Sequence, residues 1–189
     1  QGPVTATGQI LVPPPSARFG VISDVDDTVI QTDVGHLIRM ARTVFLSNAR
    51  MRLPFPGVAA FYRALHAGRD EHERNPMFYI SNSPWNLYDL FSDFFQLQDI
   101  PIGPILIMRD WGLSRHGMAG PFHPSAYKLA AIRNILQVYP RLPFVLVGDS
   151  GEKDPEIYTQ IVAANPQRIL AVYIRNVSRK PRRIRAIQA

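Results

Sequence analysis

Acidic side chains gather directly after the first strongly apolar run of the chain. Residues 19–23 are followed by residues 24–28, which hold three aspartates and a threonine. Carboxylates beside a buried strand are costly unless they are paired or bound to a metal ion. A calcium loop counted from Asp24 would need glycine at its sixth position and glutamate at its twelfth, but Val29 and Gly35 stand there. The segment is therefore either an acidic turn that ends a strand or a set of paired or metal-bound carboxylates.

A hydroxyl and an amide stand at the end of the second apolar run, residues 77–81. Ser81 ends this run and Asn82 follows it. Next to a helix N-terminus, such side chains and the neighbouring backbone N–H groups can hold an anion. Each residue alone is a weak signal, because turn chemistry accounts better for Ser81 and helix capping accounts better for Ser83.

One lysine and two aspartates complete the set of candidate polar residues. Lys128 lies in the first turns of a helix expected to begin near residue 125, where a lysine usually contacts solvent. Gly148 and Asp149 end the fourth apolar run, and Asp154 follows five residues after Asp149. We expect Gly148 to permit a tight turn and the two aspartates to converge beside Asp24. Asp154 is expected to cap the next helix as well.

The elements that must position these residues alternate along the chain. Short, continuously apolar runs are typical of strands buried on both faces of a sheet, and they lie at residues 19–23, 77–81, 105–108, 144–148 and 169–174. Helical patterns lie between them, and two are expected to begin at Ser83-Pro84 and Asp154-Pro155, a cap followed by proline. The alternation predicts an α/β fold with a parallel sheet between helices, and a site at the carboxyl ends of the strands.

The order of the polar clusters resembles the haloacid dehalogenase superfamily: Asp-x-Asp-x-Thr, then Ser, then Lys, then Gly-Asp-x-x-x-x-Asp. Longer stretches, at residues 54–58, 78–85, 109–112 and 146–158, are similar to the actin-patch-protein type of phosphatidate phosphatase, a lipin-like branch. The resemblance covers about residues 18–177, and it departs from the family at Tyr127, where histidine is expected. It implies a three-layer, doubly wound, Rossmann-like parallel sheet of about five strands, with a small insert and no large cap domain.

The same resemblance implies a phosphatase mechanism. Asp24 is expected to attack phosphorus and form an aspartyl-phosphate, and Asp26 to protonate the leaving alkoxide and then activate water. The Asp24 side chain, the Asp26 backbone carbonyl and Asp149 are expected to bind Mg²⁺, which prefers hard oxygen ligands. The implied reaction converts phosphatidate to diacylglycerol.

The remaining polar residues are expected to bind the phosphoryl group or to support the site. Ser81, the backbone N–H of Asn82 and Lys128 would neutralise the phosphoryl oxygens. Thr28 is expected to brace the loop that carries the nucleophile. Asp154 is expected to orient Lys128 or a metal-bound water rather than to bind metal directly.

Two alternative functions stay open. One is a soluble phosphomonoesterase of the same superfamily, acting on a small metabolite or a phosphoprotein. The other is a lipid-binding domain without turnover. The presence of Asp24, Asp26, Lys128 and Asp149 disfavours the second alternative, because a pure binder needs no nucleophile.

The charge is distributed unevenly. The chain has 21 Lys and Arg against 15 Asp and Glu, a net charge of +6, and no acidic residue lies at positions 34–69 or after Glu156. The stretch at 34–69 is interpreted either as solvated surface or as a region that attracts an anionic substrate or surface, and the stretch after Glu156 is interpreted as a solvated tail or linker. Nucleic-acid binding by the terminal tail is disfavoured, because no aromatic residue is interleaved among its arginines.

The chain is expected to form one catalytic domain, residues 18–177, between an irregular lead-in (residues 1–17, the remnant of a preceding region) and a basic tail (residues 178–189). Residues 36–46 have a short basic amphipathic pattern that fits either an anionic membrane surface or the domain's own core. Trp85 and Trp111 are likewise interpreted as core or interfacial residues.

The absence of cysteine excludes a disulfide scaffold, a Cys-ligated zinc site and a thiol nucleophile. No apolar run approaches the roughly 20 residues of a membrane span. We expect a cytoplasmic protein, and peripheral contact with a membrane is a further hypothesis.

Overall fold

The computed structural model describes residues 5, 8, 10–26, 28–29, 57–84, 87–109, 124–178 and 183–184. The amphipathic segment 36–46, Trp85 and Trp111 lie outside these residues. None of the helices in the described ranges is both long and apolar enough to cross a membrane.

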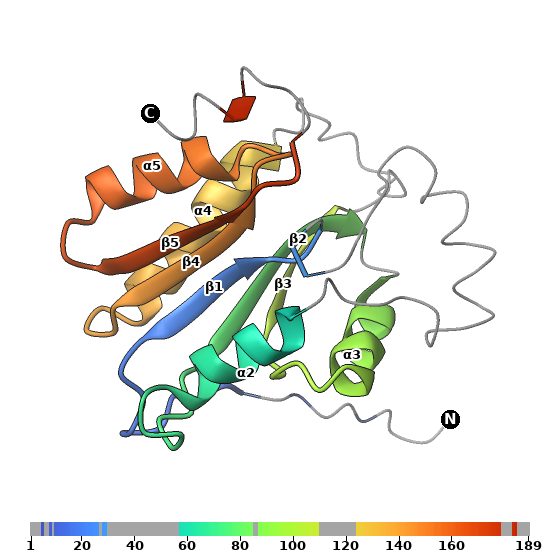
Figure 1. Ribbon diagram of the computed structural model, residues 1–189, viewed down its shortest axis with the longest axis vertical. Helices are drawn as coiled ribbons and strands as arrows, with labels where there is room; N and C mark the ends of the chain where they lie inside the picture. The colour runs from blue at the N-terminus through green and yellow to red at the C-terminus, as the bar shows by residue number, and fades with distance from the viewer. Residues whose placement is uncertain are drawn as a thin grey trace.

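Five parallel strands form a single sheet in the order β3-β2-β1-β4-β5 (Figure 1). The strands are β1 (Gly20–Asp24), β2 (Met77–Pro84), β3 (Ile105–Arg109), β4 (Phe144–Asp149) and β5 (Ile169–Arg175). Because β1 lies at the centre, the chain winds outward from it in both directions. The carboxyl ends of β1, β2 and β4 therefore lie side by side at one end of the sheet.

Within the described ranges, four helices cover the two faces of the sheet: α2 (Val58–Ala67), α3 (Tyr88–Leu97), α4 (Pro124–Val138) and α5 (Asp154–Ala164). Helices α2 and α3 pack on one face, and α4 and α5 pack on the other (Figure 1). This arrangement confirms the three-layer, doubly wound fold. The described residues include no separate cap domain.

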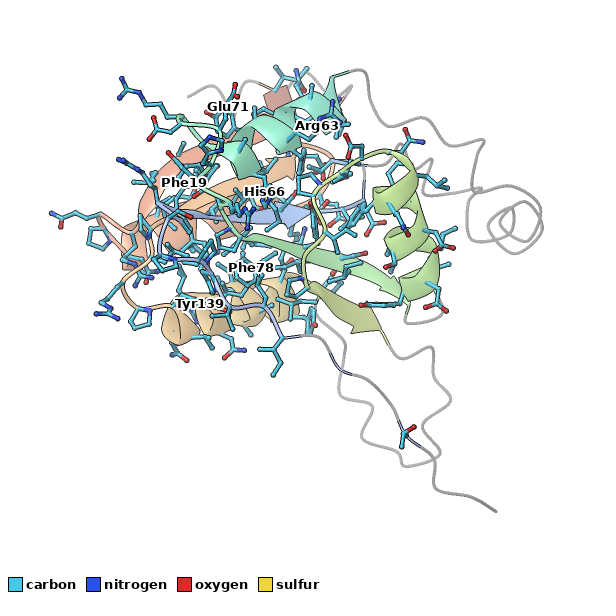
Figure 2. All side chains as sticks on the ribbon, turned by 90° about the horizontal axis from the view of Figure 1, so that it is seen from below. Phe19, Arg63, His66, Glu71, Phe78 and Tyr139 are labelled. Carbon is cyan, nitrogen blue, oxygen red and sulfur yellow. The ribbon has the colours of Figure 1, made fainter. Side chains whose placement is uncertain are left out.

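Alternation along the strands divides the core into two apolar clusters. On β1, Val21 belongs to the cluster beneath α2 and α3, and Ile22 belongs to the cluster beneath α4 and α5. On the second face, the rings of Phe78 and Tyr139 lie 5.3 Å apart between their centroids (Figure 2). Burial of both faces of β1 and β4 explains why these strands are continuously apolar until their last residues.

The prediction of burial on both faces is wrong for β5. Leu170, Val172 and Tyr173 are substantially exposed. Among the described strands, this one lies at the edge of the sheet and pairs with β4 alone. The helices cover it less completely than they cover the central strands, so a continuous apolar run does not by itself indicate two buried faces.

The predicted helix start at Ser83-Pro84 is also wrong. Strand β2 continues to Pro84, which pairs with Arg109, and α3 begins only at Tyr88. The Ser83 hydroxyl caps no helix, because it donates a hydrogen bond to Asp26 Oδ1 at 2.9 Å. A serine followed by proline is a local signal for a helix start. Here the Ser83 side chain instead contacts Asp26, in the segment that follows β1.

Candidate active site

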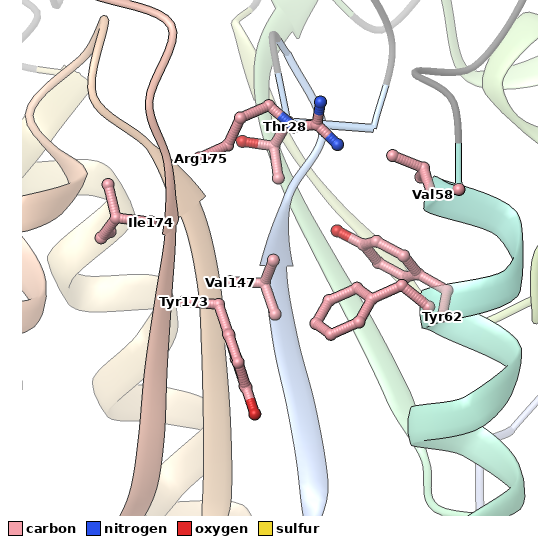
Figure 3. A pocket seen from close by; sticks show the side chains of 9 residues that line it. Thr28, Val58, Tyr62, Val147, Tyr173, Ile174 and Arg175 are labelled. Atoms are coloured by element: carbon pink, nitrogen blue, oxygen red, sulfur yellow. The ribbon is translucent and has the colours of Figure 1, made fainter.

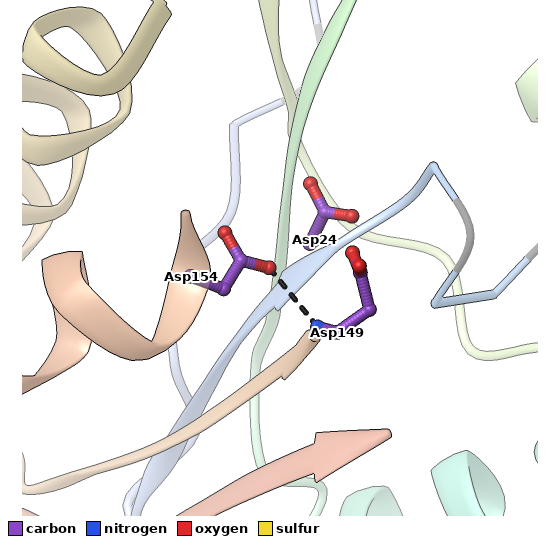
Figure 4. A group of neighbouring side chains, drawn as sticks. All are labelled: Asp24, Asp149 and Asp154. Carbon is purple, nitrogen blue, oxygen red and sulfur yellow. Dashed lines mark hydrogen bonds between the residues drawn. The ribbon is translucent and has the colours of Figure 1, made fainter. Parts of the chain in front are cut away.

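Polar residues from five elements converge at the carboxyl ends of the strands. Each of the following side chains is buried although it is charged or polar: Asp24 on β1, Ser81 on β2, Lys128 on α4, Asp149 on β4 and Asp154 on α5. Figure 4 shows the three aspartates facing one another. The structure thus brings together residues that the sequence analysis selected from separate segments.

Lys128 is the cation at the centre of this cluster. It is 1% exposed, in contrast to the solvated lysine that its helical position alone suggested. Its Nζ lies 2.7 Å from Asp24 Oδ1, 2.5 Å from Asp154 Oδ1 and 3.5 Å from Glu152 Oε2. Burial alone would lower the pKa of the ammonium group, but the three carboxylates raise it above its usual value. Lys128 is therefore charged throughout the physiological pH range.

Asp24 offers one carboxylate oxygen that has no partner among the described residues. Its Oδ1 accepts the hydrogen bond from Lys128, while its Oδ2 is buried and makes no hydrogen bond with the part of the chain that the structure describes. Burial raises the pKa of Asp24 well above its usual value, and Lys128 opposes this shift. A buried, unpaired carboxylate oxygen is costly, so this atom fits a site that binds a cation or reacts with a substrate.

Asp149 and Asp154 stand beside Asp24. One carboxylate oxygen from each of the three aspartates lies within 4.8 Å of the others, a spacing that can hold a metal ion. Both oxygens of Asp154 are already engaged, since Oδ1 contacts Lys128 and Oδ2 accepts the backbone N–H of Asp149 at 3.1 Å. Asp154 thus contacts Lys128, which is one of the two groups that it was expected to orient.

The Asp149 carboxylate is held by its own loop. Its Oδ1 accepts the backbone N–H groups of Gly151, at 2.5 Å, and Glu152, at 3.1 Å. The Thr28 hydroxyl is 3.4 Å from its Oδ2, a long contact that ties the segment after β1 to β4. Thr28 thus lies where a bracing role was expected. The Asp149 carboxylate itself faces Asp24.

Asp26 is held between two serines of β2. Ser81 Oγ donates to its Oδ2 at 2.6 Å, and Ser83 Oγ donates to its Oδ1 at 2.9 Å. Ser83 was not predicted as a site residue, because a serine followed by proline is typical of a helix cap. Side chains two positions apart on a strand share a face, so an extended β2 would have placed Ser83 beside Ser81.

Glu152 is a second residue that the sequence analysis missed. Its Oε2 accepts a hydrogen bond from Asn82 Nδ2 at 3.0 Å and also contacts Lys128. Its side chain is 35% exposed. Burial raises the pKa of Glu152, and Lys128 opposes the shift. The signal available in the sequence was its position between Asp149 and Asp154, because the loop that joins these two residues must pass over the site.

Gly148 is required for close packing rather than for the predicted turn. It lies within β4, and a Cβ built on it would stand only 2.8 Å from Asp154 Cβ and from Tyr158 Cε2. Tyr158 also donates a hydrogen bond to the Val147 carbonyl at 2.8 Å. The missing side chain thus lets the N-terminus of α5 rest directly on the strand.

We expect Gly148→Ala to lower the free energy of unfolding by about 1–3 kcal/mol, because the added methyl group overpacks the junction of β4 and α5. Urea unfolding at pH 7 would measure this change. Gly8→Ala is the matched control, since a Cβ at Gly8 meets nothing within 4 Å. Equal stabilities of the two variants would contradict this role of Gly148.

The basic tail contacts the site at Arg183. Its guanidinium group donates to the backbone carbonyl of Glu152 at 2.5 Å, to the Ser150 carbonyl at 3.2 Å and to Glu156 Oε2 at 2.7 Å. The hydrogen bond from the Arg183 side chain to the Glu156 carboxylate is the main cause that holds the pKa of Glu156 below its usual value. At this position the tail is therefore docked on the loop between β4 and α5.

A cavity of about 380 Å³ adjoins the site on the α2 side of the sheet (Figure 3). Its walls are mainly apolar and include Val58, Tyr62 and Tyr173. Arg175 and Thr28 also line it, and Thr28 connects the cavity to Asp149.

The fold and the carboxylate–lysine cluster define a protein with the haloacid dehalogenase architecture. The chain belongs to the family of the phosphatidate phosphatase APP1 catalytic domain, whose family model matches residues 19–176. It is 37% identical over 159 residues to Phosphatidate phosphatase APP1 of Saccharomyces cerevisiae, covering 83% of this chain and 26% of that protein. It is also 29% identical over 159 residues to an uncharacterized protein of Schizosaccharomyces pombe, covering 84% of this chain and 25% of that protein. The chain thus spans about a quarter of the length of these relatives.

Among solved structures, a chain of the Pnkp1/Rnl/Hen1 RNA repair complex is similar in fold. Its TM-score is 0.52 at 15% sequence identity, and the match covers 91% of this chain and 47% of that chain. At this identity the likeness shows the architecture alone.

Proposed function

We propose that this chain is the catalytic domain of a Mg²⁺-dependent phosphatase that converts phosphatidate to diacylglycerol through an aspartyl-phosphate. The observation that carries the proposal is the state of Asp24: one carboxylate oxygen is fixed by Lys128, and the other is buried with no hydrogen-bond partner among the described residues. Membership of the family supports the choice of phosphatidate.

In the first step, Asp24 Oδ2 attacks phosphorus as the bond between phosphorus and the glycerol oxygen breaks. Asp26 gives its proton to the departing oxygen, so that diacylglycerol leaves as a neutral alcohol. In the second step, Asp26 removes a proton from water, which attacks phosphorus and releases orthophosphate and the Asp24 carboxylate. The serine hydroxyls beside Asp26 can rotate, so Asp26 can accept and give a proton without leaving its place.

The carboxylates of Asp24 and Asp149 would hold the Mg²⁺ ion together with the Asp26 backbone carbonyl. Hard oxygen donors suit this ion, and carboxylate oxygens of Asp24 and Asp149 lie within 4.8 Å of each other. When bound, Mg²⁺ supplies positive charge that offsets the repulsion between the carboxylates and the phosphate dianion.

The phosphoryl oxygens would be bound by Lys128, the Ser81 hydroxyl and the backbone N–H of Asn82. Lys128 is pre-positioned by Asp24 and Asp154, so little reorganisation is needed when negative charge redistributes in the transition state. Ser81 already lies within hydrogen-bond distance of Asp26, which places its hydroxyl beside the acid–base group.

The cavity beside Thr28 supports a lipid substrate, since its apolar walls can receive part of the glycerol ester. Phosphatidate resides in membranes, so the proposal includes peripheral contact of the domain with an anionic surface. A soluble phosphomonoesterase of the same superfamily remains the alternative function.

The proposal is tested by measuring phosphate release from phosphatidate in mixed micelles and from a soluble aryl phosphate, with Mg²⁺ and with chelator. We expect release from phosphatidate that stops when the chelator is added. Faster turnover of the aryl phosphate than of phosphatidate would favour the soluble phosphomonoesterase, and no turnover of either compound would favour a lipid-binding domain.

We expect Asp149→Ala to raise the Mg²⁺ concentration for half-maximal activity by about 10–100-fold or more, because it removes a proposed metal ligand. A Mg²⁺ titration of the release rate would measure this shift. Asp70→Ala is the matched control, since the Asp70 side chain is 65% exposed and pairs with Arg18. An unchanged titration in Asp149→Ala would remove Asp149 from the set of metal ligands.

A further inference from the structure

The ammonium group of Lys128 has no N–H group to spare. A lysine ammonium donates three hydrogen bonds, and Lys128 directs them to Asp24, Asp154 and Glu152. If Lys128 binds a phosphoryl oxygen, as the proposed function requires, one of these three contacts must be given up.

The contact with Glu152 is the one that can be given up at least cost. It is the longest of the three at 3.5 Å, against 2.7 Å to Asp24 and 2.5 Å to Asp154. The Asp24 and Asp154 side chains are fully buried, whereas the Glu152 side chain is 35% exposed. Only Glu152 can therefore turn its carboxylate to solvent without leaving a charge stranded in the core.

Movement of the Glu152 side chain leaves its backbone in place. The Glu152 N–H is bound to Asp149 Oδ1, and its carbonyl accepts a hydrogen bond from Arg183. The loop that carries Asp149 and Asp154 can thus stay fixed while the carboxylate swings.

Glu152 also contacts a second residue of the proposed phosphate site. Its Oε2 accepts from Asn82 Nδ2 as well as from Lys128, so a single carboxylate oxygen bridges one residue of β2 and one residue of α4. A phosphoryl oxygen has the same charge sign and the same acceptor chemistry. From this geometry, and resting on the proposed function, we propose that the Glu152 carboxylate occupies a phosphoryl-oxygen position in the substrate-free protein and that phosphate displaces it.

The displaced carboxylate acts as an internal competitor. It weakens the binding of every phosphate that enters the site, including the orthophosphate product, and it returns to Lys128 as orthophosphate leaves. Glu152 is therefore a residue that promotes product release rather than a group that reacts with phosphorus.

The test is calorimetric titration of the full chain with inorganic phosphate in the presence of Mg²⁺. We expect Glu152→Gln to bind orthophosphate about five- to tenfold more tightly than the wild type, because a neutral amide competes less well for Lys128. Glu152→Ala, which removes the competitor, should bind more tightly still. Asp99→Asn is the matched control for loss of one negative charge. Asp99 is 86% exposed and lies between α3 and β3, at the end of the sheet away from the site, so its substitution should leave the affinity unchanged.

Three results would overturn the inference. Unchanged affinity in both Glu152 variants would show that Glu152 does not compete with phosphate. Weaker affinity would show that Glu152 holds the loop, the metal or the phosphate, because a structural role can only be lost on substitution. Failure of the wild type and all variants to bind phosphate would remove the proposed phosphate site itself, and this outcome separates failure of the proposed function from failure of the inference alone.

Discussion

Replacing Asp24 by asparagine is expected to lower the rate of phosphate release by at least about 10³-fold while the protein remains folded. The amide keeps the shape of the side chain and an oxygen for Lys128, but it is a poor nucleophile. The substitution removes one negative charge from a cluster that has more carboxylates than cations, and it removes no packing contact. Steady-state release from phosphatidate and a thermal melt of the same sample would measure the two effects.

The control for this substitution is Asp89→Asn, which makes the same chemical change at an exposed position on α3. This variant should keep the wild-type rate. Activity of Asp24→Asn within tenfold of the wild type would remove Asp24 from the role of nucleophile.

Replacing Lys128 by methionine is expected to lower the free energy of unfolding by about 3–5 kcal/mol and to abolish activity. The substitution preserves the length and apolar stem of the side chain. It leaves the carboxylates of Asp24 and Asp154 buried without their cation, and breaking a buried ion pair by removing one partner is strongly destabilising. Urea unfolding at pH 7 would measure the loss.

Two further variants make this prediction specific. Lys153→Met removes the neighbouring exposed lysine and should change stability by less than about 0.5 kcal/mol. Adding Asp154→Asn to Lys128→Met should recover part of the lost stability, because it removes one of the stranded charges. A Lys128→Met variant as stable as Lys153→Met would show that the buried cluster does not depend on this cation.

The architecture was largely predictable because strands and helices leave strong periodic signals. Continuous apolar runs located all five strands, and their alternation with amphipathic patterns predicted the three layers. Burial at β5 was overestimated, because an apolar run cannot tell a central strand from an edge strand. The position of an edge depends on the order of the strands, which is a property of the whole sheet.

The site was predictable where a residue follows a strand and missed where its role depends on a distant partner. Asp24 and Asp149 end their strands, and the sheet necessarily brings them together. Ser83 and Glu152 acquire their contacts from other elements, and the local signal at Ser83 indicated a helix cap. Arg183 lies 31 residues from the carbonyl that it contacts, so no short pattern relates the two.

The central claim is that Asp24 is phosphorylated during turnover, and trapping that intermediate tests it most directly. The protein would be mixed with phosphatidate and Mg²⁺, quenched with acid and reduced with borohydride, which converts an aspartyl-phosphate to homoserine. Peptide mass spectrometry would then locate the modified residue. The account predicts homoserine at position 24, absent from Asp24→Asn and from samples without substrate. Phosphate release with no modification at position 24, or with modification of another residue, would contradict it.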